Sequence, residues 1–303
     1  MHFSKIFGVL CLGLIAVCNA AIERVDDSDL IHILTGKGDV VALFTKTGCA
    51  ACVEYENVVG KIQSELRQTL GATVVQAHNS NLIHIYDPSR EPALLYFRRG
   101  IPILYHGAVN EEEIVQFFGE NREPGVKELS DDNFEHLTQA STGATTGDWF
   151  IFFYSAECVL CQRLYAVWEA VGGTLRRKIN VARMNSLTAG MGTAQRLKIA
   201  EAPEFVFLRL GKLYRYPLKD YTPKAFIEFV EDGYLRNTQP EDVPKPSSLI
   251  DELSFEHLMD YIRNSGTLPL AVVGTFAVLF LFYVVKSLFK PSEKKKNITK
   301  KDK

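Results

Sequence analysis

Residues 149–169 read WFIFFYSAECVLCQRLYAVWE, and this stretch decides the fold. Its first six residues, Trp149–Tyr154, form a continuous apolar run that predicts a buried strand. Cys158 and Cys161 follow after a short interval, and the chain from Cys161 to about Arg176 predicts a helix. A strand, a Cys-x-x-Cys pair and a helix in direct succession indicate an α/β structure with the cysteines at the start of the helix.

The same plan occurs earlier in the chain. The apolar run Val40–Phe44 (VVALF) predicts a buried strand, and it is followed by Cys49 and Cys52. From Cys52 to about Leu70 the sequence again predicts a helix. The two Cys-x-x-Cys pairs therefore stand in the same local context.

A proline precedes a later strand in each copy. Pro92 stands before ALLYFRRG and Pro203 before EFVFLRLG, so both segments consist of a strand, a basic turn and a glycine. The second cysteine of each pair lies 40 residues before this proline in the first copy and 42 in the second. Such similar spacing predicts an internal duplication. We expect two tandem α/β domains at 21–122 and 127–235.

The N-terminus has the pattern of a signal peptide. Lys5 supplies a positive charge, residues 7–17 form an apolar stretch, and Cys18-Asn19-Ala20 resembles a cleavage site. The apolar stretch is shorter than the roughly 20 residues that a membrane helix needs, which argues against the alternative of an uncleaved anchor. We expect residues 1–20 to be removed.

A second apolar segment, 268–289, predicts one C-terminal transmembrane helix. Its 22 residues, at about 1.5 Å each, reach roughly 33 Å and so cross a hydrocarbon core of about 30 Å. The lysine-rich tail 290–303 is then expected in the cytosol, which gives a type I membrane protein. The alternative is a buried helix of a soluble protein.

The residues on either side of this span also carry expectations. Segment 236–267 contains three prolines and then an amphipathic stretch, so it predicts a linker and a juxtamembrane segment. Lys300 and Lys301, fourth and third from the end, resemble a dilysine signal for retrieval to the endoplasmic reticulum. A tail that contacts anionic lipid is the alternative.

Charge excludes one class of partner. The whole chain carries a net charge of −2. From Lys286 onward eight lysines against Glu293 and Asp302 give +6, so the remainder carries −8. That acidic remainder has no basic groove with interleaved aromatics, and we expect no nucleic-acid partner.

The cysteine count favours redox chemistry. The chain has six cysteines, and two of them lie in the expected signal peptide. The four that remain form two close pairs, whereas structural disulfides commonly connect distant parts of small secreted domains. A single zinc site made by all four is disfavoured, because the pairs stand far wider apart than the about 15 to 20 residues of zinc-binding pairs. We expect no metal and no cofactor.

Together these features resemble the transmembrane thioredoxin-related members of the protein disulfide isomerase family. The resemblance covers about residues 24–235, and it is closest in FFYSAECVLCQRLYAVWE and RLKIAEAPEFVFLRLGKLYRY. It implies two tandem thioredoxin-like domains. It also implies a thiol–disulfide oxidoreductase of the endoplasmic-reticulum membrane, with its domains in the lumen and cysteine-containing client proteins as substrates.

The resemblance implies a role for each site residue. The first cysteines, Cys49 and Cys158, are the expected nucleophiles, because a helix N-terminus stabilises the thiolate. Their partners Cys52 and Cys161 lie one turn on, should be more buried and should resolve the mixed disulfide. A second set of residues is expected to bind substrate as the family's cis-prolines do: Pro92 and Pro203.

Departures from the family pattern indicate that the two cysteine pairs are weaker oxidants than typical sites of the family. No histidine stands between the cysteines, and Glu157 and Glu91 place negative charge near the sulfurs, which raises thiol pKa values. Leu43 and Phe152 occupy the positions of the family's buried carboxylate. We expect reduction potentials nearer about −270 mV than about −180 mV. The alternative function is a lumenal client-binding or quality-control module with little turnover.

Overall fold

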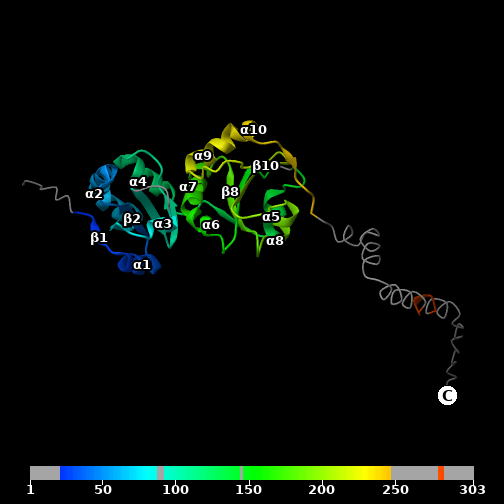
Figure 1. Cartoon of the computed structure of the whole chain (residues 1–303), viewed down its shortest axis with the longest axis horizontal. Helices are drawn as coiled ribbons and strands as arrows, with labels where there is room; N and C mark the ends of the chain where they lie inside the picture. Colours follow the sequence, from blue (N-terminus) through cyan, green and yellow to red (C-terminus); the bar gives the residue numbers. More distant parts are fainter. Residues whose placement is uncertain (1–20, 87–91, 144–145, 247–278, 283–303) are drawn as a thin grey trace, which may run out of the picture. The chain divides into compact units, whose positions relative to one another are not determined.

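The computed structural model describes residues 21–86, 92–143, 146–246 and 279–282. One compact unit extends from Met1 to Lys245, and a second comprises Pro246–Lys303. Within the first unit we distinguish an N-terminal lobe, residues 21–122, and a C-terminal lobe, residues 125–245, each built on its own sheet (Figure 1).

Eleven strands are formed by the described residues. They are β1 (Glu23–Val25), β2 (Val40–Thr45), β3 (Thr73–His78), β4 (Ala93–Arg98), β5 (Ile101–Leu104), β6 (Lys127–Leu129), β7 (Trp149–Tyr154), β8 (Asn180–Asn185), β9 (Glu204–Arg209), β10 (Lys212–Arg215) and β11 (Glu241–Asp242).

The helices of the same unit separate or flank these strands. They are α1 (Asp27–Thr35), α2 (Ala50–Leu70), α3 (Ile83–Tyr86), α4 (Glu111–Glu120), α5 (Asp131–Thr138), α6 (Val159–Arg163), α7 (Tyr165–Leu175), α8 (Met191–Arg196), α9 (Pro223–Glu228), the π-helical turn η1 (Phe229–Gly233) and α10 (Tyr234–Asn237).

The two sheets repeat one strand order. The N-terminal sheet runs β1-β3-β2-β4-β5, and the C-terminal sheet runs β6-β8-β7-β9-β10 with β11 added at its edge. In both sheets the central strand pairs parallel with one neighbour and antiparallel with the other: β2 with β3 and β4, and β7 with β8 and β9. β11 lies beyond residue 235, so the C-terminal sheet continues past the expected domain boundary.

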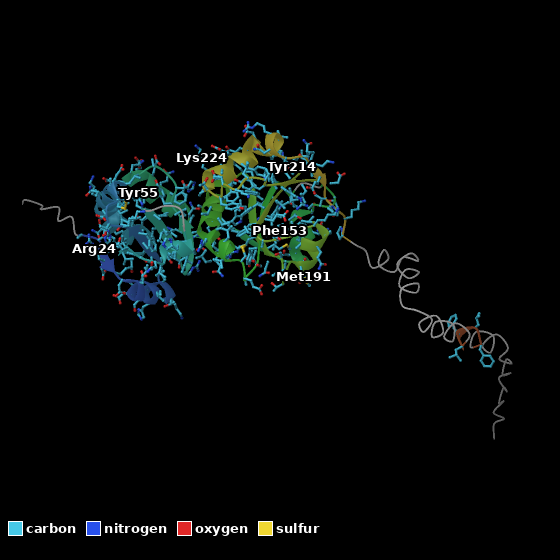
Figure 2. The ribbon with its side chains drawn as sticks, viewed as in Figure 1. Arg24, Tyr55, Phe153, Met191, Tyr214 and Lys224 are labelled. Atoms are coloured by element: carbon cyan, nitrogen blue, oxygen red, sulfur yellow. A yellow bond between two sulfur atoms is a disulfide. The ribbon has the colours of Figure 1, made fainter. Side chains whose placement is uncertain are left out.

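Alternation along β7 divides the core of the C-terminal lobe. Phe150 and Phe152 belong to a buried apolar cluster that continues into the N-terminal lobe. Trp149, Ile151 and Phe153 belong to a separate cluster. Phe153 is labelled within the C-terminal lobe in Figure 2. Successive residues of a strand point to opposite faces, so this strand is covered on both sides.

Trp168 of α7 anchors the first of these clusters. Its ring lies 4.8 Å from Phe150 and 5.2 Å from Phe205, between ring centroids. The helix predicted from Cys161 to about Arg176 is broken, because α6 ends at Arg163 and α7 begins at Tyr165.

The start of the C-terminal lobe approaches the backbone of α7 closely. Gly125, the first residue of this lobe, lies against Gly172 of α7, where an added Cβ would stand 3.0 Å from the Gly172 carbonyl carbon. A Cβ on Gly172 would stand 2.8 Å from a Val126 methyl group. α7 also packs on β5, and α3 on α6, so helices of the two lobes meet directly (Figure 1).

The expected membrane helix must be corrected. No helix within the described residues is both long and apolar enough to cross a membrane. α2 has 21 residues, but it carries charged side chains along its length, including Glu54 and Arg67. A bilayer-spanning helix needs about 20 predominantly apolar residues, and no described helix meets that requirement.

Several expectations fall outside the described residues. These are the signal peptide 1–20, the span 268–289 apart from 279–282, the linker 236–267 beyond residue 246, and the tail 290–303 with Lys300 and Lys301.

Candidate active sites at the two cysteine pairs

Cys49 and Cys52 lie at the N-terminal end of α2, shortly after the end of β2. Gly48 adopts a left-handed φ of 76°, a conformation that glycine reaches without steric cost, and it turns the chain into the helix. Cys49 is the N-cap of α2, and its Sγ accepts a hydrogen bond from the Cys52 N–H at 3.1 Å. The two sulfurs form a disulfide. Cys49 is half-buried, whereas Cys52 is only 2% exposed.

Cys158 and Cys161 repeat this arrangement after β7. Cys158 is the N-cap of α6, and its Sγ accepts from the Cys161 N–H at 3.0 Å. These cysteines are also disulfide-bonded. Cys158 is half-buried and Cys161 is 1% exposed. Each pair thus has one accessible sulfur and one buried sulfur, as expected from the sequence.

This geometry suits thiol–disulfide exchange. The backbone N–H that points at the first sulfur stabilises negative charge there, and so favours the thiolate that attacks a disulfide. The buried second sulfur is already within bonding distance of the first, so it can resolve a mixed disulfide without a large movement.

The two expected substrate-binding prolines stand at the starts of corresponding strands. The Ala202–Pro203 peptide is cis, which agrees with the resemblance for that bond. Pro92 directly precedes β4, and Ala93 pairs with Phe44 of β2. The residue before it, Glu91, lies outside the described part of the chain.

A cavity of about 340 Å³ opens beside Cys158. Ala202 and Leu187 line it together with two acidic residues, Glu157 and Glu201. Glu157 was expected from the sequence to place negative charge at this sulfur, and Glu201 was not recognised. Its position directly before Ala202-Pro203 was the available signal, because that segment lies beside the cysteines in the resemblance.

The interior positions behind both sites are apolar. Leu43 and Phe152 are fully buried, so neither position supplies a carboxylate. In the N-terminal lobe a different polar group lies nearby. Gln76 donates from Nε2 to Thr45 Oγ1 at 2.9 Å and to Glu56 Oε1 at 2.7 Å.

His78 continues this hydrogen-bond chain toward the redox loop. Its Nδ1 lies 3.1 Å from Thr45 Oγ1, and its Nε2 lies 3.3 Å from Thr47 Oγ1. Thr47 is two residues before Cys49, so the chain supports the loop that carries the first sulfur. Sequence reasoning assigned His78 no role, and the polar Gln76 within the buried strand TVVQAH was the signal it missed.

Among the described residues no group of three or more His, Cys, Asp and Glu side chains could hold a metal ion. Each cysteine pair forms its own disulfide, so the four sulfurs are not assembled into one zinc site.

Comparisons with known proteins identify relatives of the chain. The thioredoxin family model matches residues 125–231. A thioredoxin domain-containing protein of Theileria parva is 32% identical over 168 residues, which cover 53% of this chain and 76% of that protein. Bovine protein disulfide-isomerase A4 is 22% identical over 63% of this chain, but the match spans only 31% of its own length. A crystal structure of ERdj5 covers 70% of this chain with a TM-score of 0.39 and 15% identity.

The match to the thioredoxin family model also corrects the expected number of thioredoxin-like domains. One thioredoxin domain is found, in the C-terminal lobe, where two tandem thioredoxin-like domains were expected. The α/β thioredoxin-like fold stands. The N-terminal lobe shares the strand order and carries a Cys-x-x-Cys pair, but the match to the family model does not include it.

Proposed function

Because this chain belongs to the thioredoxin domain-containing proteins, we propose that it is a thiol–disulfide oxidoreductase acting on cysteines of client proteins. One observation carries the proposal. In each pair an accessible sulfur at a helix N-terminus accepts a backbone N–H and is bonded to a buried sulfur three residues on.

The reaction follows from this arrangement. In the reduced C-terminal pair, the Cys158 thiolate attacks one sulfur of a client disulfide, forms a mixed disulfide and expels the other client sulfur as a thiolate. The Cys161 thiolate then attacks the Cys158 sulfur and releases the second client thiolate. The client gains two electrons and the enzyme pair loses them. The reverse sequence oxidises a client dithiol.

The acidic residues near Cys158 favour a low reduction potential for the Cys158–Cys161 pair. Glu157 and Glu201 destabilise a thiolate at Cys158. They therefore destabilise the reduced form of the pair relative to the disulfide, which lowers its reduction potential. We place the potential nearer the about −270 mV of thioredoxin than the about −180 mV of protein disulfide isomerase. The pair would then reduce or isomerise more readily than it oxidises.

We further propose that the chain works in the lumen of the endoplasmic reticulum. Two observations support this compartment. The first 20 residues have the pattern of a secretory signal, and the relatives include proteins named protein disulfide-isomerase. Disulfide exchange on secreted clients takes place in such an oxidising compartment.

A second candidate is a client-binding module with little turnover. Leu43 and Phe152 favour it, because no carboxylate at these positions assists proton removal from the buried cysteine. The two candidates differ in one property. An oxidoreductase forms a covalent intermediate through Cys158, and a binding module does not.

Trapping tests the proposal. Cys161→Ala should accumulate mixed disulfides that dithiothreitol releases, because the intermediate can no longer be resolved. Cys158→Ala, the matched control, should accumulate none, and Cys52→Ala with Cys49→Ala repeats the comparison for the first pair. Absence of adducts from both Cys161→Ala and Cys52→Ala would transfer support to the binding module.

A further inference from the structure

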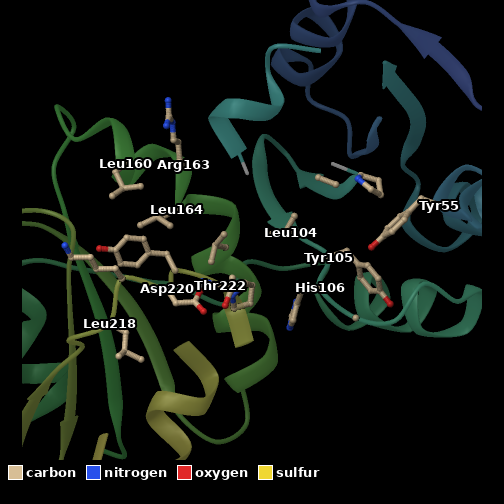
Figure 3. A pocket seen from close by; sticks show the side chains of 17 residues that line it. Tyr55, Leu104, Tyr105, His106, Leu160, Arg163, Leu164, Leu218, Asp220 and Thr222 are labelled. Atoms are coloured by element: carbon tan, nitrogen blue, oxygen red, sulfur yellow. Dashed lines mark hydrogen bonds between the residues drawn. The ribbon is translucent and has the colours of Figure 1, made fainter. Parts of the chain in front are cut away.

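A cavity of about 810 Å³ lies between the two lobes (Figure 3). Tyr55, Leu104, Tyr105 and His106 come from the N-terminal lobe and form one wall. The other wall belongs to the C-terminal lobe, and the residues used below are Leu160, Arg163, Leu164, Leu218 and Lys219.

Corresponding elements of the two lobes face each other across this cavity. Tyr55 stands three residues after Cys52 on α2, and Leu164 stands three residues after Cys161 at the junction of α6 and α7. The segment Leu104–Gly107, which begins at the last residue of β5, faces the segment Leu218–Pro223, which ends at the first residue of α9. Both redox helices therefore contribute to a single cavity.

The cavity is also lined by residues that belong to the surroundings of the two cysteine pairs. Leu160 lies between Cys158 and Cys161 and lines the cavity directly. Pro92 lines it from the other lobe, at the start of the strand that pairs with β2, and β2 leads into the Cys49 loop. The cavity is therefore lined by one residue between the C-terminal cysteines and by the expected substrate-binding proline of the N-terminal lobe.

Its surface combines apolar and cationic groups. Leu160 and Leu218 remain 36% and 40% exposed, a feature that burial by a ligand would reverse. Arg163 and Lys219 have no ion-pair partner among the residues that the structure describes. The one carboxylate of the lining, that of Asp220, accepts a hydrogen bond from the Thr222 N–H at 3.0 Å. The lining thus has an excess of positive charge.

We propose that this cavity binds an extended segment of a client polypeptide in which large apolar side chains are flanked by carboxylates. The inference rests on the proposed function, and it adds the client feature that is recognised. Apolar side chains would cover Leu160 and Leu218, and the carboxylates would approach Arg163 and Lys219. A client held in this way presents its cysteines to either pair without leaving the protein.

Fluorescence anisotropy with a labelled peptide tests the proposal. The probe is a short cysteine-free peptide with Glu-Trp-Leu-Glu at its centre, and the protein is the full chain in its oxidised form. We expect it to bind at least about tenfold more tightly than matched peptides with Glu-Ser-Ser-Glu or Lys-Trp-Leu-Lys at the centre. Leu218→Ser and Arg163→Gln should each weaken binding about five- to tenfold.

Two matched variants control for general loss of an apolar or a charged side chain. Leu235→Ser removes an exposed leucine of α10, and Arg177→Gln removes an exposed arginine, and neither residue lines the cavity. Both should leave affinity unchanged. Equal affinity for the three peptides, or equal loss in cavity and control variants, would overturn the proposal.

The outcome is separate from that of the proposed function. The probe has no cysteine, so its binding requires no disulfide exchange. Trapping through Cys158 with absent peptide binding would remove this inference alone. Peptide binding with absent trapping would remove the oxidoreductase and leave the cavity as a binding site.

Discussion

Arg98 at the end of β4 and Glu169 in α7 form an ion pair between the two lobes, with Nη2 3.0 Å from Oε2 and each side chain 1% exposed. Burial lowers the pKa of the Arg98 guanidinium from its ordinary value, and the Glu169 carboxylate opposes that change. Arg98 Nη1 also donates to the Glu123 carbonyl at 3.2 Å, and Glu169 Oε2 accepts from the Gly125 N–H at 3.3 Å. The pair therefore joins both lobes and the segment that connects them.

Glu169→Gln should destabilise the protein by about 3 kcal/mol, because loss of one partner leaves the other charge buried and unpaired. The measurement is urea denaturation of the full chain. Glu123→Gln is the control, since it breaks a pair with Arg99 at 2.8 Å that is largely exposed and should cost less than about 1 kcal/mol. Equal losses in the two variants would show that the buried pair contributes nothing specific.

Glycine-to-alanine substitution should change the stability of the protein in opposite directions in α2 and α7. A Cβ on Gly60 of α2 meets no atom within 4 Å, so Gly60→Ala should stabilise by about 0.5–1 kcal/mol through helix propensity. A Cβ on Gly172 of α7 meets Val126 at 2.8 Å, so Gly172→Ala should destabilise by about 1–3 kcal/mol. Thermal melting of both variants measures the difference, and a shift of the same sign in each would contradict the close approach of Val126 to α7.

Asp131 predicts a pH dependence of stability. Burial alone would raise the pKa of its carboxyl, but hydrogen bonds from Thr193 and Gly192 and the nearby Arg196 charge hold it below the ordinary value of 3.8. The Gly192 and Thr193 N–H groups donate to it at 2.9 and 2.7 Å. A depressed pKa in the folded state stabilises the protein above the unfolded-state pKa, and that contribution is lost as pH falls through the folded-state pKa.

Asp131→Asn should therefore be less stable than the parent by about 0.5 kcal/mol near pH 7, because the amide oxygen can still accept hydrogen bonds but the negative charge beside Arg196 is lost. The deficit should stay constant down to about pH 5 and shrink below about pH 4. Urea midpoints measured across this range test it. A deficit that does not change with pH would show that the amide loses packing and not charge.

Local sequence predicted the elements that carry chemistry. The apolar runs of β2 and β7 and the helix starts at Cys49 and Cys158 were all expected, because each depends on residues that are neighbours in the chain. The burial of the second cysteine in each pair was expected from the family resemblance.

Features that depend on distant residues could not be found in this way. Arg98 was recognised only as part of a basic turn, and its partner Glu169 is 71 residues away. The break at Leu164 places this residue on the cavity wall opposite Tyr55, and periodicity along one helix does not predict such a break. The membrane helix was expected from hydropathy alone, and no described helix provides it.

Glu157→Gln should raise the reduction potential of the C-terminal pair. Removal of a negative charge beside Cys158 stabilises its thiolate, hence the reduced form, and a more stable reduced form makes a stronger oxidant. A change of about half a pKa unit corresponds to roughly 15 mV. Titration in glutathione buffers measures it. Asp132→Asn, an exposed carboxylate on α5, is the control and should leave the potential unchanged. A fall in potential would reverse the assigned role of Glu157.

The order of alkylation should follow the exposure of the four sulfurs. In the reduced protein the half-buried Cys49 and Cys158 should react first with iodoacetamide, at least about tenfold faster than their partners, because they combine access with the helix N-terminus. Cys52 and Cys161, at 2% and 1% exposed, should react only after local opening. Mass spectrometry of timed samples assigns each site, and a denatured sample, in which all four react alike, is the control. If Cys161 reacted as fast as Cys158, it would be an equally available nucleophile, and the division into attacking and resolving cysteines would fail at that pair.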